Sequence, residues 1–113
     1  MDLKFGKSAK ELRDAVNSED GSLLLRLYPQ NSKMIMMALQ VLRQARNLNE
    51  VMPFAMFRPH ALQGGDRDIF SMSVGGRKRL IIKTLNKDGK VTKKVDFSST
   101  YGLVVEVSEH YGD

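Results

Sequence analysis

The sequence contains no cysteine and only two histidines among its 113 residues. Without cysteine, the chain has no disulfide framework and no thiolate metal site. The two histidines, His60 and His110, stand far apart and lack the spacing of metal ligands, which argues against a zinc site. We therefore expect a protein that works without a metal ion or another cofactor.

Long apolar runs and several familiar motifs are also missing. No stretch approaches the roughly 18 apolar residues of a membrane-spanning helix, and the first residues lack the apolar segment of a signal peptide. The chain has no glycine-rich dinucleotide loop, no Walker loop and no nucleophilic serine elbow. We therefore expect a cytoplasmic protein that makes no membrane contact.

Positive charge is present in excess. Eighteen lysines and arginines against thirteen acidic residues give a net charge of +5 at pH 7, which favours polyanionic partners. A hydrophobic fraction of 42% is typical of a folded chain. The length, and the absence of a linker or repeat, predict a single domain over residues 1–113.

The first half of the chain, up to about residue 50, has mainly helical spacing. A short strand is expected at residues 2–5, and Ser8 is a suitable cap for a short helix. The clearest helix begins at Asn31 or Ser32. Its apolar residues recur at helical spacing and form one stripe, which we expect to pack on a sheet: Met34, Met37, Ala38, Val41, Leu42 and Ala45.

The second half has strand spacing instead. Phe70, Met72 and Val74 alternate with serines, and a glycine pair then predicts a tight reversal before the strand RLIIKT. Further strands are expected at residues 91–97, after the turn NKDG, and at residues 103–108. Helices followed by an antiparallel meander predict an α+β domain of two layers.

Cationic side chains gather around the first of these hairpins. If Leu80 and Ile82 point to the core, alternation turns Arg79, Ile81 and Lys83 to the opposite face. Arg77 and Lys78 precede them at the turn. These charges have two possible roles. They either stay in solvent and prevent the strand edges from pairing with another chain, or they form a binding patch for phosphates.

Four segments, taken in this order, resemble the RelE-type toxins of bacterial toxin–antitoxin systems, in their HigB, or proteic killer, branch. They are LRQARNLNEV, FRPHALQGGDRDIFSMSV, GGRKRLIIKT and VVEVSEHYGD, and the likeness extends from about residue 34 to the end. The resemblance implies helices packed on a curved antiparallel sheet. It implies a ribosome-dependent endoribonuclease that cuts mRNA through the RNA 2′-hydroxyl and so inhibits translation. The implied partners are the ribosome, mRNA and a HigA-like antitoxin with a helix-turn-helix.

The resemblance also implies roles for individual residues. Arg79 would stabilise the charge that develops on the phosphorus, and His110 or His60 would transfer protons. Tyr111 would orient the hydroxyl or stack on a base. Four further cations would hold RNA phosphates: Arg67, Arg77, Lys78 and Lys83.

Two departures from the branch pattern keep other functions open. The branch commonly has lysine where this chain has Gln63, and it commonly ends in Tyr-His where this chain has His110-Tyr111. One alternative is a catalytically inactive relative that only binds partners. The other is a toxin of the same fold that binds and inhibits DNA gyrase, although a pure binder needs no proton-transfer groups.

Overall fold

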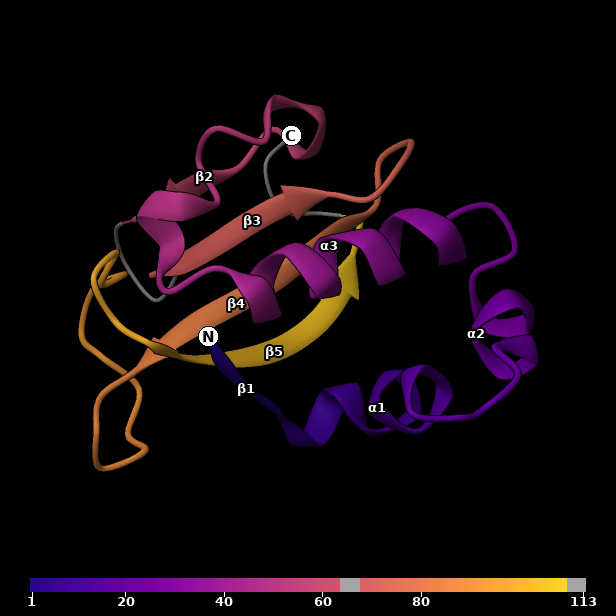
Figure 1. The fold of residues 1–113 in the computed structure, drawn as a ribbon, viewed down its shortest axis with the longest axis horizontal. Helices are drawn as coiled ribbons and strands as arrows, with labels where there is room; N and C mark the ends of the chain where they lie inside the picture. Colours follow the sequence, from indigo (N-terminus) through magenta and orange to yellow (C-terminus); the bar gives the residue numbers. More distant parts are fainter. Residues whose placement is uncertain (64–67, 110–113) are drawn as a thin grey trace.

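The computed structural model describes residues 1–63 and 68–109, and their strands form one sheet in the order β1-β5-β4-β3-β2 (Figure 1). The strands are β1 (Asp2–Phe5), β2 (His60–Leu62), β3 (Ile69–Ser73), β4 (Arg79–Leu85) and β5 (Tyr101–Ser108). The predicted α+β class is confirmed. The prediction of a wholly antiparallel sheet is wrong at one edge, because β1 pairs parallel with β5. No hairpin joins β1 to a neighbour, so nothing forces it to run antiparallel.

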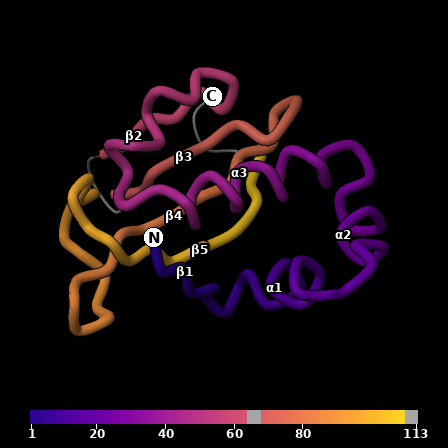
Figure 2. The backbone as a smooth tube through the Cα atoms, in the orientation of Figure 1, coloured from indigo at the N-terminus to yellow at the C-terminus, as the bar shows by residue number. Residues whose placement is uncertain are grey.

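The helices precede the other four strands along the chain (Figure 2). They are α1 (Lys10–Val16), α2 (Ser22–Leu27) and α3 (Ser32–Gln44). A 3₁₀ turn at Lys7–Ala9 precedes α1, and two more follow α3 at Leu48–Glu50 and Ala55–Phe57. In Figure 1, α3 lies across one face of the sheet, while α2 packs against α1 and α3. Within the described ranges, no helix has both the length and the apolar character needed to cross a membrane.

The buried side of α3 is rotated from the predicted stripe. Ala38 and Leu42 are fully buried as expected, but so are Ile35 and Leu39, which the prediction omitted. Met34 and the other early members of the stripe are only partly buried and lie at its margin. The helix contacts more than the sheet, because the segment after it also folds back into the core, and a wider apolar face is therefore buried.

Alternation along β3 and β4 supplies the sheet's share of the core. Phe70, Leu80 and Ile82 have no exposed surface and belong to the core cluster, which confirms the predicted inward direction of Leu80 and Ile82. Phe70 meets Phe97 edge to face, with ring centroids 5.9 Å apart. Ile81 is also buried but lies outside this cluster, as expected for a side chain on the opposite face.

The pairing of β4 with β5 contains one irregularity. Ile81 is opposite Glu106, whereas Ile82 is opposite Val104, so that β5 carries one extra residue at this point. Such a bulge bends its strand and increases the local twist. In Figure 1, β5 follows a pronounced arc across the sheet.

The connection between β4 and β5 contains a turn instead of the predicted strand at residues 91–97. The NKDG turn forms as expected, but pairing beyond it is limited to one isolated bridge between Leu85 and Val91. Here, side-chain oxygens accept hydrogen bonds from backbone N–H groups that would otherwise pair with a neighbouring strand. Thr84 Oγ1 accepts from the Asp96 N–H, and the Asp96 carboxylate accepts from the Ser98 N–H and hydroxyl, which lowers the pKa of Asp96.

Thr84 is the buried centre of this network, and its replacement by valine should weaken the fold. The hydroxyls of Thr84 and Thr92 are 2.5 Å apart, and Thr84 is 1% exposed. Thr84→Val leaves the Asp96 N–H without its acceptor, so urea denaturation should give a free energy of unfolding about 1–3 kcal/mol lower. Thr100→Val, at an exposed threonine, is the matched control and should change little. Equal midpoints for the two variants would contradict this role of Thr84.

Candidate functional site

The strand register places several polar side chains on the face of the sheet that is turned away from α3, which we call the far face. Residues directly opposite each other in a ladder share a face. His60 is opposite Ser71, Ser73 is opposite Arg79, and Arg79 is opposite Ser108. Since Leu80 and Ile82 point into the core, these partners all lie on the far face.

Arg79 lies across the far face and contacts the neighbouring strand. Its Nη1 donates to Ser71 Oγ at 3.3 Å, on the diagonal from its direct partner Ser73. Ser71 is completely buried, whereas Arg79 is partly exposed. A guanidinium has five N–H donors, and in the described part of the chain this contact engages only one nitrogen. The other donors can bind an anion.

His60 lies at the start of β2, on the other side of Ser71 from Arg79. His60 pairs with Ser71 in the antiparallel ladder between β2 and β3. Its Nδ1 is 2.9 Å from the carbonyl oxygen of Arg58, which adopts a left-handed conformation with φ 43°. A carbonyl can only accept, so Nδ1 carries the proton and the neutral ring presents Nε2 as an acceptor.

Three of the predicted phosphate-binding residues lie in the described part of the chain, and they differ in position and in their ion pairs. Lys78 forms an ion pair with Glu109, with Nζ 2.7 Å from Oε1, whereas Arg77 is exposed at the hairpin tip. A pair as open to solvent as this one is worth only about 0–1 kcal/mol, so phosphate can replace the carboxylate. Lys83 is partly exposed on the far face, about 13 Å along β4 from Arg79.

Three of the predicted site residues, Arg67, His110 and Tyr111, lie outside the described residues. In the sequence, His110 and Tyr111 follow Ser108 by two and three residues, and Ser108 is the β5 partner of Arg79. Their roles stay predictions.

Two further polar residues of the far face were missed by sequence reasoning. Ser108 is buried beside Arg79 in the ladder, and Glu106 is partly exposed opposite Ile81. Glu106 brings a carboxylate, and thus a proton acceptor, to the same face as the arginine. Period-2 alternation from residue 103 would have given Glu106 the opposite direction, because the bulge was invisible in the sequence.

Asn31 is the third missed residue, since only a capping role was expected for it. It occupies the N-cap position of α3, but its side chain makes no capping bond and instead donates from Nδ2 to the carbonyls of Val74 and Gly75, at 3.0 and 2.9 Å. Gly75 has φ 107°, and a Cβ there would lie 3.0 Å from this amide nitrogen. Asn31 therefore fixes the cationic hairpin to α3.

Removing this link should destabilise the protein. Asn31 is 7% exposed, so Asn31→Ala leaves the Val74 and Gly75 carbonyls without their donor in a confined space. We expect a loss of about 1–3 kcal/mol in the free energy of unfolding, measured by urea denaturation. Gln30→Ala changes the exposed neighbour and should leave the midpoint within error. A wild-type midpoint for Asn31→Ala would show that the link is dispensable.

Comparison with known proteins adds no assignment. No protein-family model matches the sequence, and a search of the curated proteins finds no match either. Among residues 1–63 and 68–109, no three histidine or acidic side chains gather closely enough to hold a metal ion. The chemistry on which a function can be argued is that of Arg79 and His60 around Ser71.

Proposed function

We propose that this protein is the toxin of a toxin–antitoxin system, of the RelE type and HigB branch. It is a ribosome-dependent endoribonuclease that cuts mRNA and thereby inhibits translation in the cytoplasm. The observation that carries this proposal is the arrangement of Arg79 and His60 on the far face, on either side of the buried Ser71. A cation and an imidazole acceptor supply two of the functions that RNA cleavage without a metal requires, namely charge stabilisation and a base.

The proposed reaction uses the 2′-hydroxyl of the mRNA as nucleophile. A bond forms between that oxygen and the phosphorus, and the bond from phosphorus to the 5′-oxygen breaks, leaving a cyclic phosphate and a 5′-hydroxyl. Nε2 of His60 is suited to take the 2′ proton, because Nδ1 already donates to Arg58. An acid must protonate the 5′-oxygen, a role that we assign to His110 with Tyr111 orienting the nucleotide. Each proton transfer contributes roughly a hundred- to ten-thousand-fold in rate.

Arg79 acts on charge instead of protons. Two negative oxygens develop on the phosphorus at the pentacoordinate stage, and paired guanidinium N–H groups match them in geometry. The contact with Ser71 fixes one nitrogen and so limits the rotation of the side chain. Arg67, Arg77, Lys78 and Lys83 would bind phosphates on either side of the cut. Cleavage should therefore weaken as salt rises, because each phosphate contact releases counterions.

A purified translation system tests the proposal. The protein is added to ribosomes translating one defined mRNA, and cut sites are mapped by primer extension. We expect cuts within ribosome-bound codons, 5′-hydroxyl ends on the downstream fragments, and intact mRNA when ribosomes are omitted. Transcripts that stay whole on translating ribosomes would overturn the proposal. Inhibition of DNA supercoiling instead would identify the gyrase-binding alternative.

The proposed antitoxin is a short helix-turn-helix protein encoded beside this chain. Its acidic surface would complement the net charge of +5 and cover the far face. Coexpression of the neighbouring gene should restore growth to cells that produce this protein, and the two chains should copurify. Growth arrest that persists despite copurification would contradict coverage of the active face.

A further inference from the structure

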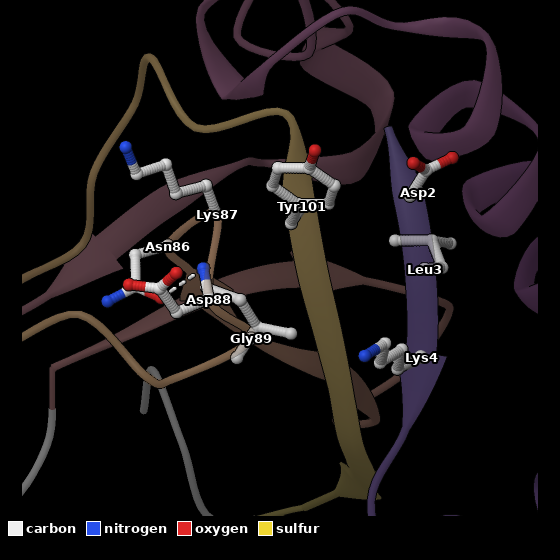
Figure 3. A pocket seen from close by; sticks show the side chains of 9 residues that line it. Asp2, Leu3, Lys4, Asn86, Lys87, Asp88, Gly89 and Tyr101 are labelled. Atoms are coloured by element: carbon white, nitrogen blue, oxygen red, sulfur yellow. Dashed lines mark hydrogen bonds between the residues drawn. The ribbon is translucent and has the colours of Figure 1, made fainter.

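A hollow lies between β1 and the turn that follows β4 (Figure 3). Its volume of about 390 Å³ lies within the range of small-ligand pockets. Tyr101, the first residue of β5, forms its floor, and its ring lies over the strand in Figure 3. Lys4 of β1 and Lys87 of the turn belong to the two walls. Two other hollows of similar volume have no aromatic side chain in their lining.

The two walls of the hollow approach each other closely at one end. Gly89 of the turn has φ 80°, and a Cβ at this position would lie 3.7 Å from Nζ of Lys4. In Figure 3, the Lys4 ammonium points across from β1 toward this glycine. The hollow therefore carries a positive charge at the end where β1 and the turn meet, beside the Tyr101 floor.

Each wall carries one carboxylate as well as one ammonium group. Asp2 lies on β1 and Asp88 lies in the turn, so the lining has no net charge. Such a lining favours a ligand that offers both anionic oxygens and N–H donors over a simple anion. A nucleotide meets both demands and also suits the aromatic floor: its phosphate suits lysine, an N–H group of its base suits a carboxylate, and its base stacks on tyrosine.

The hollow opens on the same face as Arg79. Tyr101 is opposite Leu85 on β4 and opposite Asp2 on β1, and Leu85, Lys83 and Arg79 alternate down one side of β4. The strand distance from Arg79 to Leu85 is about 20 Å. Lys83 lies between them, so one nucleic-acid strand can follow cations from the Arg79 site to the hollow.

We propose that this hollow is a nucleotide subsite for single-stranded RNA. The proposal rests on the ribonuclease function for the identity of its ligand as RNA. The subsite binds a nucleotide about 20 Å from the scissile phosphate, stacks its base on Tyr101 and holds its phosphate with Lys4. Asp2 or Asp88 would accept a hydrogen bond from an N–H group of the base, which each of the four bases offers.

Fluorescence anisotropy with a labelled 2′-O-methyl cytidine hexamer, which cannot be cleaved through the 2′-oxygen, tests the subsite. Tyr101→Leu should weaken binding about 5- to 100-fold, the range for losing one stacked base. Tyr101→Phe keeps the ring and should bind like wild type. Phe54→Leu removes an aromatic residue of similar exposure outside the hollow, 43% against 36% for Tyr101, and should also bind like wild type.

The contribution of Lys4 to RNA binding is tested with one variant and one matched control variant. Lys4→Gln should reduce the dependence of log affinity on log salt by about one phosphate contact. Lys10→Gln makes the same charge change at an exposed lysine of α1 and should leave this slope unchanged.

The outcomes separate the subsite from the nuclease. Displacement of the labelled hexamer by cytidine monophosphate would show that the hollow binds a single nucleotide. Displacement by unlabelled hexamer alone would show that it binds a nucleotide only as part of an RNA strand. Both results support the subsite. Wild-type affinity in Tyr101→Leu overturns it, even if mRNA is cut normally. Tyr101-dependent binding together with intact transcripts on ribosomes removes the nuclease and leaves the subsite standing.

Discussion

Arg79→Ala is expected to lower the rate of mRNA cleavage on ribosomes by about 100- to 1,000-fold, the usual effect of removing one oriented donor to a developing oxyanion. Arg79 is partly exposed on the far face and lies outside the hydrophobic core cluster, so the variant should stay folded. The rate is measured as single-turnover cleavage on programmed ribosomes. Circular dichroism spectra and urea midpoints close to those of wild type would confirm that the fold is intact.

Two companion variants define what Arg79 contributes. Arg79→Lys keeps the charge but loses the planar pair of donors, and we expect it to recover only part of the rate. Arg43→Ala removes an exposed arginine from the last turn of α3, away from the far face, and should cleave like wild type. If Arg79→Ala cleaves at the wild-type rate, Arg79 has no part in the mechanism.

Phe70→Ala should produce the largest loss of stability. The ring has no exposed surface, belongs to the core cluster and meets Phe97 edge to face. Removing it creates a cavity between the sheet and its covering layer, with an expected loss of about 3–5 kcal/mol in the free energy of unfolding. Urea denaturation followed by circular dichroism measures this loss.

Phe54→Ala makes the same substitution at a side chain that is 43% exposed, and its midpoint should shift far less. Phe70 points to the core and Arg79 to the far face, so their variants separate stability from chemistry. Phe70→Ala should lose activity in parallel with its folded fraction, whereas Arg79→Ala should lose it while folded. A Phe70→Ala midpoint equal to that of Phe54→Ala would contradict the assignment of the core face.

Local sequence patterns correctly predicted features that depend on a single strand or turn. Alternation placed Leu80 and Ile82 in the core, and the glycine pair at 75–76 has the positive φ values expected of a tight reversal. The same reasoning failed at residues 91–97. Their apolar spacing is typical of a strand, but the hydroxyl of Thr84 binds the backbone there, and that bond joins residues twelve apart.

The candidate site depends on long-range pairing, which local patterns do not contain. The face of Arg79 followed from alternation, but the position of His60 across Ser71 depends on the β2–β3 register. Asn31 binds carbonyls 43 and 44 residues away, and no spacing within either segment indicates this contact. The strand at residues 2–5 was predicted, but its parallel pairing with β5 was hidden, because three helices separate β1 from every strand that follows.

The extra residue in β5 has a consequence for where the two ends of that strand direct their side chains. In a regular strand, positions 101 and 108 differ by an odd number and would project in opposite directions. Because pairing passes from Val104 to Glu106 without using Val105, both ends project the same way. Deleting Val105 would turn one end through half a rotation, so that either Tyr101 or Ser108 would enter the apolar interior.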